Sequence, residues 1–183
     1  MTRMSPRKVT CFAASSSRNS INKQLVSYVA GLVEGAEVEV LDLNDYELPL
    51  FSVDREADIG QPLLAQAFLD KIHASDALII AFAEHNGCYS AAYKNLYDWV
   101  SRIQPKVYLD RRMLLLATSP GGRGGQSVLE LALAQIPRFG GEIRGSVSMP
   151  NFTENFDLER GVVANADIDS EIRTALARLM QDD

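Results

Sequence analysis

Residues 8–25 read KVTCFAASSSRNSINKQL, and this stretch decides the fold. Its first part, residues 9–14, is an apolar run rich in Val, Thr and Phe, which predicts a buried strand. A hydroxyl-rich turn follows at residues 15–20. Apolar residues then recur at helical spacing, at Ile21, Leu25, Val29 and Leu32. A strand, a turn and a helix start in this order predict a phosphate site, because the first turn of a helix has unpaired N–H groups and the positive end of the helix dipole.

The turn at residues 15–20 has two interpretations. It contains neither the G-x-x-x-x-G-K-[ST] pattern of ATP-binding loops nor the G-x-G-x-x-G pattern of dinucleotide-binding loops. In one interpretation, Ser20 only caps the following helix and the other serines form a polar turn. In the other, the serine hydroxyl groups donate to a bound phosphate. This segment alone does not separate the two interpretations.

The bulk composition predicts one globular domain spanning residues 1–183. Apolar residues make up 46% of the chain and charged residues 23%, which is the ordinary range for such a domain. The net charge of −6 and the lack of a basic run argue against nucleic-acid binding and against docking on an anionic membrane. No apolar run approaches the roughly 20 residues that a membrane helix needs.

The N-terminus and the cysteines indicate a reducing compartment. The first residues, MTRMSPRK, lead into a strand without an apolar signal segment, so we expect a cytoplasmic location. Cys11 and Cys88 are too few for a disulfide framework, and with two histidines they are too few for a zinc site. We expect Cys11 to be a small core residue and Cys88 to be a loop thiol without a role. Five acids show no metal-ligand spacing, so no metal site is predicted: Asp42, Asp45, Asp54, Glu56 and Asp58.

Apolar periodicity predicts strands and helices in alternation. Strands are expected at residues 9–14, 36–43, 76–83, 112–118 and 142–149. Helices are expected at residues 20–34, 62–73, 90–103, 126–139 and 169–180, the last capped by Asp169 or Ser170. A long connection, residues 44–62, follows the second strand. The fold class is therefore α/β: a three-layer sandwich with a five-stranded parallel sheet in the order 2-1-3-4-5 and helices on both faces.

Three loops of unusual composition follow the first, third and fourth strands, at residues 15–20, 84–90 and 119–125. Ligands of such sheets bind beyond the C-terminal strand ends, where the strand order reverses, so we expect these loops to meet at one rim. The glycines of the third loop either let N–H groups approach a planar ligand or form a flexible connection. Asn86 and Gly87 can donate to the polar edge of a heterocycle. His85 either transfers a proton or, as is usual for a loop histidine, is solvated or stacks.

The helix after the second loop carries an aromatic face. Its residues Tyr93, Leu96, Tyr97 and Val100 follow helical spacing. Together with Trp99 they indicate a core and a subunit interface rather than a cofactor site. Lys94 is expected to be solvated or ion-paired.

With these loops in view, nearly the whole chain resembles the NADPH-dependent FMN reductase family of flavodoxin-like proteins, which includes quinone, chromate and azo-dye reductases. Residues 15–22, SSSRNSIN, are similar to the family's phosphate loop G-S-x-R/S-x-S-x-N. Residues 83–99, AEHNGCYSAAYKNLYDW, are similar without a gap to P-E-Y-N-G-S-x-P-G-x-L-K-N-x-x-D-W. Residues 119–125, SPGGRGG, match the family's loop at the isoalloxazine edge.

The sequence departs from these motifs at several positions. Ser15 stands where the phosphate loop usually has Gly, and Ser90-Ala91 stand where the second motif has Pro-Gly. His85 replaces the usual Tyr, in a loop that lies beside the flavin in the family. The resemblance therefore implies the same cofactor with an altered flavin affinity or substrate choice.

The resemblance implies a non-covalent FMN with its phosphate held by Ser15, Ser17, Arg18, Ser20 and Asn22. It implies a ring system between two loops, formed by Glu84, His85, Asn86 and Gly87 and by Ser119, Pro120, Gly121 and Gly122. NADPH or NADH would deliver hydride to the flavin, and a quinone or another small acceptor would take the electrons. No side chain need act as an acid or base, so no catalytic residue is named. Family members form dimers or tetramers, so we expect a homo-oligomer, with which the Tyr93 and Tyr97 face is compatible.

Two other functions fit the same sequence. A flavodoxin-like electron carrier would bind FMN without using NAD(P)H, although such carriers are usually more acidic around the flavin. A non-catalytic binding protein on the same scaffold is the second alternative, because a fold does not fix a function.

Overall fold

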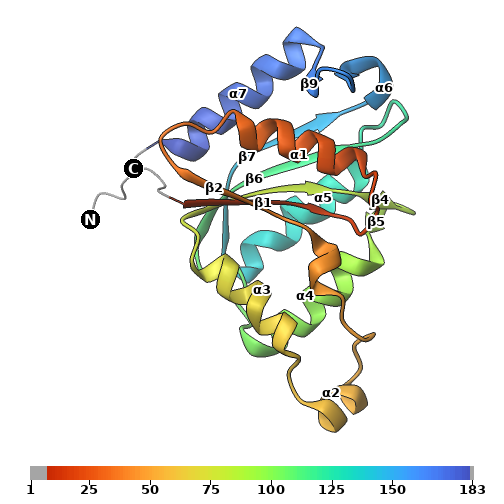
Figure 1. Cartoon of the computed structure of the whole chain (residues 1–183), viewed down its shortest axis with the longest axis vertical. Coiled ribbons are helices and arrows are strands. Elements are labelled where there is room, and N and C mark those ends of the chain that lie inside the picture. The colour runs from red at the N-terminus through yellow and green to blue at the C-terminus, as the bar shows by residue number, and fades with distance from the viewer. Residues whose placement is uncertain (1–7, 182–183) are drawn as a thin grey trace.

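Five parallel strands form the central sheet of the computed structural model, which describes residues 8–181 (Figure 1). They are β1 (Lys8–Ala14), β2 (Glu37–Leu41), β3 (Ala77–Phe82), β6 (Arg111–Thr118) and β7 (Gly141–Met149). Their order across the sheet is β2-β1-β3-β6-β7, and every neighbouring pair is parallel. The predicted fold class and strand order are confirmed.

Helices cover both faces of this sheet. They are α1 (Ile21–Gly31), α3 (Leu63–His73), α4 (Ala91–Ile103), α5 (Gln126–Gln135) and α7 (Ala166–Met180). α1 and α7 pack on one face, and α3, α4 and α5 pack on the other (Figure 1). In β3, Leu78, Ile80 and Phe82 face the second group, and the residues between them face the first. Both faces are buried, which explains why β3 is apolar throughout.

Short elements lie between the predicted ones. They are η1 (Leu43–Tyr46), α2 (Val53–Ile59), β4 (Glu84–His85), β5 (Cys88–Tyr89), η2 (Ile136–Phe139), α6 (Phe152–Asn155), β8 (Phe156–Asp157) and β9 (Val162–Val163). The helix predicted to continue to residue 139 ends as an α-helix at Gln135 and changes to the 3₁₀ turn η2. Pro137 accounts for this change, because it has no N–H group for an α-helical bond.

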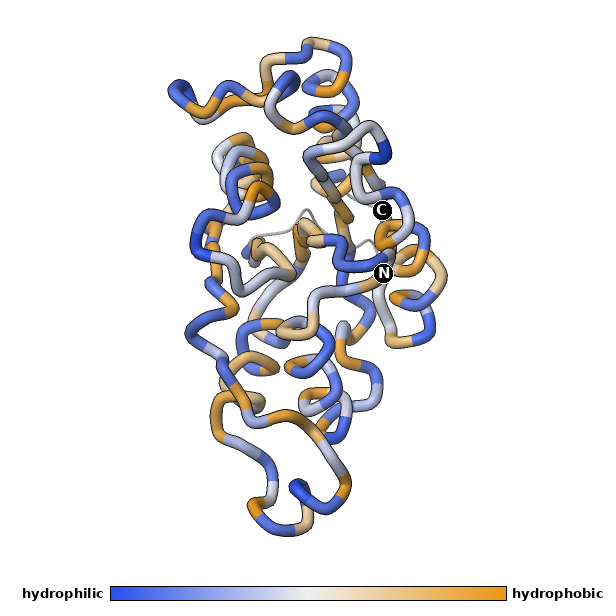
Figure 2. The backbone as a smooth tube through the Cα atoms, turned by 90° about the vertical axis from the view of Figure 1, so that its right-hand side faces the viewer, coloured by the Kyte–Doolittle hydropathy of each residue, from blue (hydrophilic) through white to orange (hydrophobic). Residues whose placement is uncertain are grey.

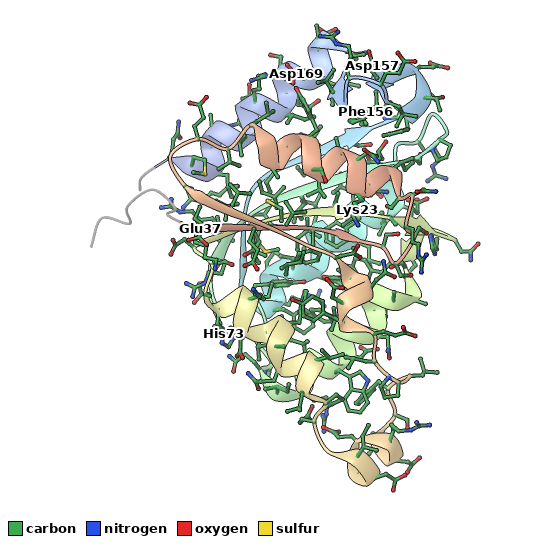
Figure 3. All side chains as sticks on the ribbon, viewed as in Figure 1. Lys23, Glu37, His73, Phe156, Asp157 and Asp169 are labelled. Atoms are coloured by element: carbon green, nitrogen blue, oxygen red, sulfur yellow. The ribbon has the colours of Figure 1, made fainter. Side chains whose placement is uncertain are left out.

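The predicted start of α7 is wrong. The helix begins at Ala166, and the side chain of Asn165 caps it by accepting from the N–H groups of Asp167 (3.1 Å) and Ile168 (3.2 Å). Ile168 packs against the core, so the buried face starts one turn before the residues used for the prediction. The predicted cap Asp169 lies inside the helix, where it accepts from the Tyr28 hydroxyl (2.5 Å) and pairs with Arg173 (Figure 3).

The long connection after β2 is not structureless, because it contains η1 and α2. In Figure 1, α2 stands away from the sheet at one end of the molecule, and Figure 2 shows apolar residues along this protrusion. Leu50, Val53 and Leu63 are 79%, 70% and 87% exposed. A contiguous exposed apolar patch marks an interaction surface, whereas single exposed apolar side chains are ordinary.

One ion pair joins α1 to the start of η1. The ammonium of Lys23 donates to the carboxylate of Asp42, and the N–H of Asn44 donates to the same carboxylate at 3.0 Å (Lys23 is labelled in Figure 3). These contacts, chiefly the one with Lys23, lower the pKa of Asp42 to about 2. The pair therefore connects the helix of the predicted phosphate site to the segment that follows β2.

We expect this pair to make unfolding pH-dependent. A lowered pKa in the folded state stabilises the protein above the ordinary carboxyl pKa of 3.8, and this contribution disappears as the pH falls to about 2. Urea unfolding should therefore show wild type more stable than Asp42→Asn at pH 7, with a difference that shrinks below pH 4. Asp45→Asn, in the same turn, is the control. A difference that stays constant down to pH 2, or that Asp45→Asn reproduces, would contradict this prediction.

Candidate functional site

The three predicted loops meet at the C-terminal rim of the sheet and enclose a cavity of about 290 Å³, called the rim cavity below. Its volume lies near the lower limit of small-molecule sites. Its walls come from the segments after β1, β3 and β6: Ser15, Ser17, Asn19, Ser20, Ile21, Asn22, Ala83, Glu84, His85, Thr118, Ser119 and Pro120. The structure thus brings together segments that are about 100 positions apart in the chain.

The first wall is the strand–turn–helix segment. Ser20 caps α1 by accepting from the N–H of Lys23 (3.3 Å), and Ser15 Oγ accepts from the N–H of Ser17 (3.2 Å). Ser20 therefore caps α1, as one interpretation of this turn predicted. Ser20 also lines the rim cavity, so its capping role does not exclude a phosphate site there. The first-turn N–H groups of Ile21 and Asn22 have no partner within the helix.

This wall fits a phosphate. α1 has no acidic side chain in its first turn, so the positive end of its dipole is not neutralised there. The cavity at this end combines first-turn N–H groups with the hydroxyl groups of Ser15, Ser17 and Ser20. Such a donor set suits a phosphate monoester, which presents three acceptor oxygens.

Asn22 also makes hydrogen bonds to a distant segment, which the sequence did not predict. Its side chain donates to the carbonyl of Thr118 (3.1 Å) and accepts from the N–H of the same residue (3.0 Å). The side chain is 3% exposed, and Thr118 Oγ1 in turn donates to the carbonyl of Met149 (2.7 Å). Asn22 therefore fastens the start of α1 to the end of β6, and its side chain is occupied by this contact.

The second wall is a hairpin where a simple loop was expected. β4 and β5 are antiparallel and are joined by Asn86 and Gly87, with φ values of 54° and 76°. Two consecutive positive φ values are the requirement of a type I′ turn, for which Asn-Gly is the preferred sequence. Burial raises the pKa of Tyr89 on β5, so its phenol stays neutral at physiological pH.

Glu84 fixes this hairpin to α5. Its Oε2 accepts from the N–H of Val128 at 3.0 Å, in the first turn of a helix whose N-cap, Gly125, has no side chain to offer. A carboxylate beside the first turn of a helix is favourable for the helix dipole. One carboxylate therefore caps α5 and positions the second wall.

The third wall contains glycines of two kinds. Gly124 and Gly125 have positive φ, and an added Cβ would approach backbone or side-chain atoms within 3 Å, so packing requires both glycines. Gly121 has no atom within 4 Å of the place of a Cβ, and Gly122 has only Asn151 Oδ1 at 3.8 Å. The space above Gly121 and Gly122 is open, as a planar ring near this rim would require.

The structure places eight of the predicted site residues in the wall of the rim cavity: Ser15, Ser17, Ser20, Asn22, Glu84, His85, Ser119 and Pro120. The other five lie on the same three loops outside that wall: Arg18, Asn86, Gly87, Gly121 and Gly122. The prediction missed four lining residues: Asn19, Ile21, Ala83 and Thr118. Each missed residue adjoins a predicted one, so adjacency in sequence was the available signal.

The aromatic face of α4 belongs to the core. Tyr93 is 3% exposed and Trp99 is fully buried, and the Tyr93 and Tyr108 hydroxyl groups share a hydrogen bond of 2.5 Å. The predicted core role is confirmed, but Tyr93 cannot also form a subunit interface in this conformation. Lys94 pairs with Asp98, as expected.

Neither a membrane-spanning helix nor a metal-ligand cluster occurs in residues 8–181. None of the helices in that range combines the length and the apolar character needed to cross a bilayer. The same range contains no cluster of three or more His, Cys, Asp or Glu side chains arranged to hold a metal ion.

The sheet order and the rim cavity define the class of protein: flavodoxin-like, with the start of α1 at the C-terminal rim. A solved structure of FerB, a flavoenzyme NAD(P)H:(acceptor) oxidoreductase from Paracoccus denitrificans, has a TM-score of 0.74 to this chain. The similarity covers 95% of both chains at 23% identity, and it shows the fold.

The sequence also identifies the family of the chain. The family model described as NADPH-dependent FMN reductase matches residues 7–153. The chain belongs to this family, as the motifs predicted. The description of this family names FMN and NADPH, the same cofactor and one of the two co-substrates that the resemblance implied.

Two plant proteins illustrate the distance to its relatives. An NADPH:quinone oxidoreductase from Arabidopsis thaliana is 35% identical over 99 residues, which cover 54% of this chain and 49% of that protein. A probable NADPH:quinone oxidoreductase 2 from Oryza sativa subsp. japonica is 30% identical over 128 residues, which cover 68% of this chain and 62% of that protein. The chain thus spans about half to three fifths of the length of these relatives.

Proposed function

We propose that this protein is an NAD(P)H-dependent reductase that holds FMN in the rim cavity and passes electrons to a quinone or a similar small acceptor. The observation that carries the proposal is the convergence of a phosphate-type helix start and a fixed hairpin on one cavity, with an open glycine segment next to it in the third loop. Membership of the NADPH-dependent FMN reductase family supports it.

Each wall has a distinct task in this proposal. The hydroxyl groups of Ser15, Ser17 and Ser20 and the start of α1 bind the phosphate, with Arg18 beside them. The hairpin at Glu84–His85 and the loop from Ser119 to Gly122 hold the two edges of the ring system and limit the access of water. Bound FMN would supply hydride acceptance from the nicotinamide and electron delivery to the acceptor. No residue is assigned as a catalytic acid or base.

The visible absorption spectrum of the purified protein tests the proposal. We expect the bands of oxidised flavin after loading with FMN, and their loss when NADPH or NADH is added without oxygen. Flavin bands that persist with either nucleotide would favour the electron carrier. No flavin uptake on titration would favour the non-catalytic binding protein.

The proposed phosphate site in the first wall leads to a separate prediction. The triple substitution of Ser15, Ser17 and Ser20 by Ala should weaken FMN binding by about 3 kcal/mol, roughly 1 kcal/mol per lost donor, or about 100-fold in Kd. Quenching of flavin fluorescence during titration measures this. Ser16→Ala, in the same turn but outside the rim cavity, is the matched control and should bind FMN as wild type does. An unchanged Kd in the triple variant would show that the phosphate binds elsewhere.

The acceptor, the assembly state and the location belong to the same proposal. The two plant relatives are named as quinone oxidoreductases, which favours a quinone. The exposed apolar side chains around α2 favour a homodimer or homotetramer, because they would be covered there. A cytoplasmic location agrees with the two free cysteines.

A further inference from the structure

A second and larger cavity adjoins the rim cavity. Its volume is about 440 Å³, and it lies between residues 43–50, which follow β2, and the first turn of α4; it is called the side cavity below. Ser16 lines one end of it, and its neighbours Ser15 and Ser17 line the rim cavity. The two cavities are therefore separated by a single turn of chain. The proposed binding of FMN does not use the side cavity.

The outer wall of the side cavity is fixed by α4. Asn95 donates to the carbonyl groups of Leu48 (3.1 Å) and Pro49 (3.2 Å) and accepts from the N–H of Phe51 (2.8 Å). The buried indole of Trp99 donates to the same Pro49 carbonyl at 2.7 Å. Four hydrogen bonds thus hold a segment that has no regular secondary structure. The cavity is pre-formed, which is typical of a ligand site.

The lining of the side cavity suits a nucleoside. Leu48, Leu50 and the ring of Tyr46 offer apolar surface to a planar base. α4 contributes the methyl groups of Ala91 and Ala92, so a ligand can approach the helix closely. The exposed carboxylate of Glu47 can accept from the hydroxyl groups of a ribose.

The only charge in the lining of the side cavity, among the described residues, is negative. Glu47 is the charged residue in its lining, and no Lys or Arg of the described chain lines it. Two lysines on the neighbouring helices are already paired, Lys23 with Asp42 and Lys94 with Asp98. A group with two negative charges would therefore meet a carboxylate in this lining, and Arg18, two residues beyond Ser16, is already assigned to the FMN phosphate.

We propose that the side cavity binds the adenosine half of the nicotinamide co-substrate, that Glu47 accepts from its ribose hydroxyl groups, and that the protein uses NADH in preference to NADPH. This inference rests on the proposed function, because it assigns the second half of a dinucleotide whose nicotinamide reacts at the rim cavity. The two ring systems of a dinucleotide need neighbouring sites, and these two cavities are lined by consecutive residues of one turn, Ser16 in the side cavity and Ser15 and Ser17 in the rim cavity. A carboxylate at the ribose selects the free 2′-hydroxyl, whereas a 2′-phosphate requires an Arg.

ADP-ribose and its 2′-phosphate derivative test the assignment without turnover. Calorimetric titration of the FMN-loaded protein should show that ADP-ribose binds about tenfold or more tightly than the 2′-phosphate, because the latter brings like charges together. ADP-ribose should compete with NADH in steady-state assays and leave FMN bound. In Glu47→Gln the preference should fall to about threefold or less, because the repulsion is removed. Glu34→Gln, an exposed acid at the far end of α1, should keep the wild-type preference.

A substitution that partly fills the side cavity tests the assignment independently. Ala91→Leu adds bulk at an exposed position of the α4 wall, and it should weaken ADP-ribose binding about fivefold or more while FMN binds as before. Three results would each overturn the assignment. Wild type could bind ADP-ribose and its 2′-phosphate equally well, or Glu47→Gln and Glu34→Gln could change the preference by the same amount. ADP-ribose could also compete with the quinone in place of NADH. Failure of FMN uptake, or of flavin reduction by both nucleotides, would instead overturn the proposed function.

Discussion

Asn22→Ala is expected to lower the free energy of unfolding by about 4 kcal/mol, because it leaves two buried backbone groups of Thr118 without their partner, at about 2 kcal/mol each. For a chain of this size, the melting temperature should fall by roughly 8–16 °C. FMN affinity should fall as well, since the same side chain holds the phosphate turn against the end of β6. Urea unfolding of the FMN-free protein gives the stability, and fluorescence titration gives the affinity.

Two further variants separate this role from a general effect of the turn. Asn22→Asp keeps an acceptor for the Thr118 N–H but has no donor for its carbonyl, so about half of the loss is expected. Asn19→Ala, at an exposed position of the same turn, should change stability by about 0.5 kcal/mol or less. Equal losses in Asn19→Ala and Asn22→Ala would show that the bonds to Thr118 contribute little.

Gly124→Ala is expected to destabilise the protein by about 3–4 kcal/mol. Its φ of 59° costs an L-residue about 1–2 kcal/mol, and overpacking costs about 1–3 kcal/mol more. The added Cβ would lie 2.9 Å from the backbone nitrogen of Pro150 and would also clash with Ser148 Oγ, whose hydroxyl donates to the Gly124 carbonyl. The backbone atom cannot rotate away, so the loop must shift. Urea unfolding measures the loss.

Gly121→Ala is the matched control in the same loop. Its Cβ would meet no atom within 4 Å, and its φ is not positive, so the expected change in stability is about 0.5 kcal/mol or less. FMN binding is expected to weaken in this variant, because the methyl group enters the space left for the ring. Similar stability losses in Gly121→Ala and Gly124→Ala would show that the two positions do not differ in how well they accommodate a side chain.

The sheet could be predicted because its strands are buried on both faces. Continuous apolar runs such as residues 113–117 have no other common explanation when helices alternate with them. The meeting of the three loops followed from the strand order, since the C-terminal ends of parallel strands share one rim. The contacts of the predicted residues with FMN stay predictions, tested by the serine substitutions above.

Bonds between distant segments could not be predicted. Asn22 meets Thr118 across 96 positions, and Glu84 meets Val128 across 44, and no local pattern encodes either partner. For the same reason the four glycines of the third loop looked equivalent in sequence, although packing requires two of them and the other two border open space. The hairpin is a different case, because Asn86-Gly87 is a strong turn signal that the expectation of a plain loop did not use.

The two cysteines make the hairpin accessible to chemical labelling. Cys11 is buried in β1, and burial raises its pKa to about 12, so its thiolate is scarce and shielded at neutral pH. Cys88 is exposed, directly opposite His85 across the hairpin. We therefore expect a maleimide dye to attach at Cys88 without mutagenesis, and its emission to respond to a ligand near His85, which lines the rim cavity.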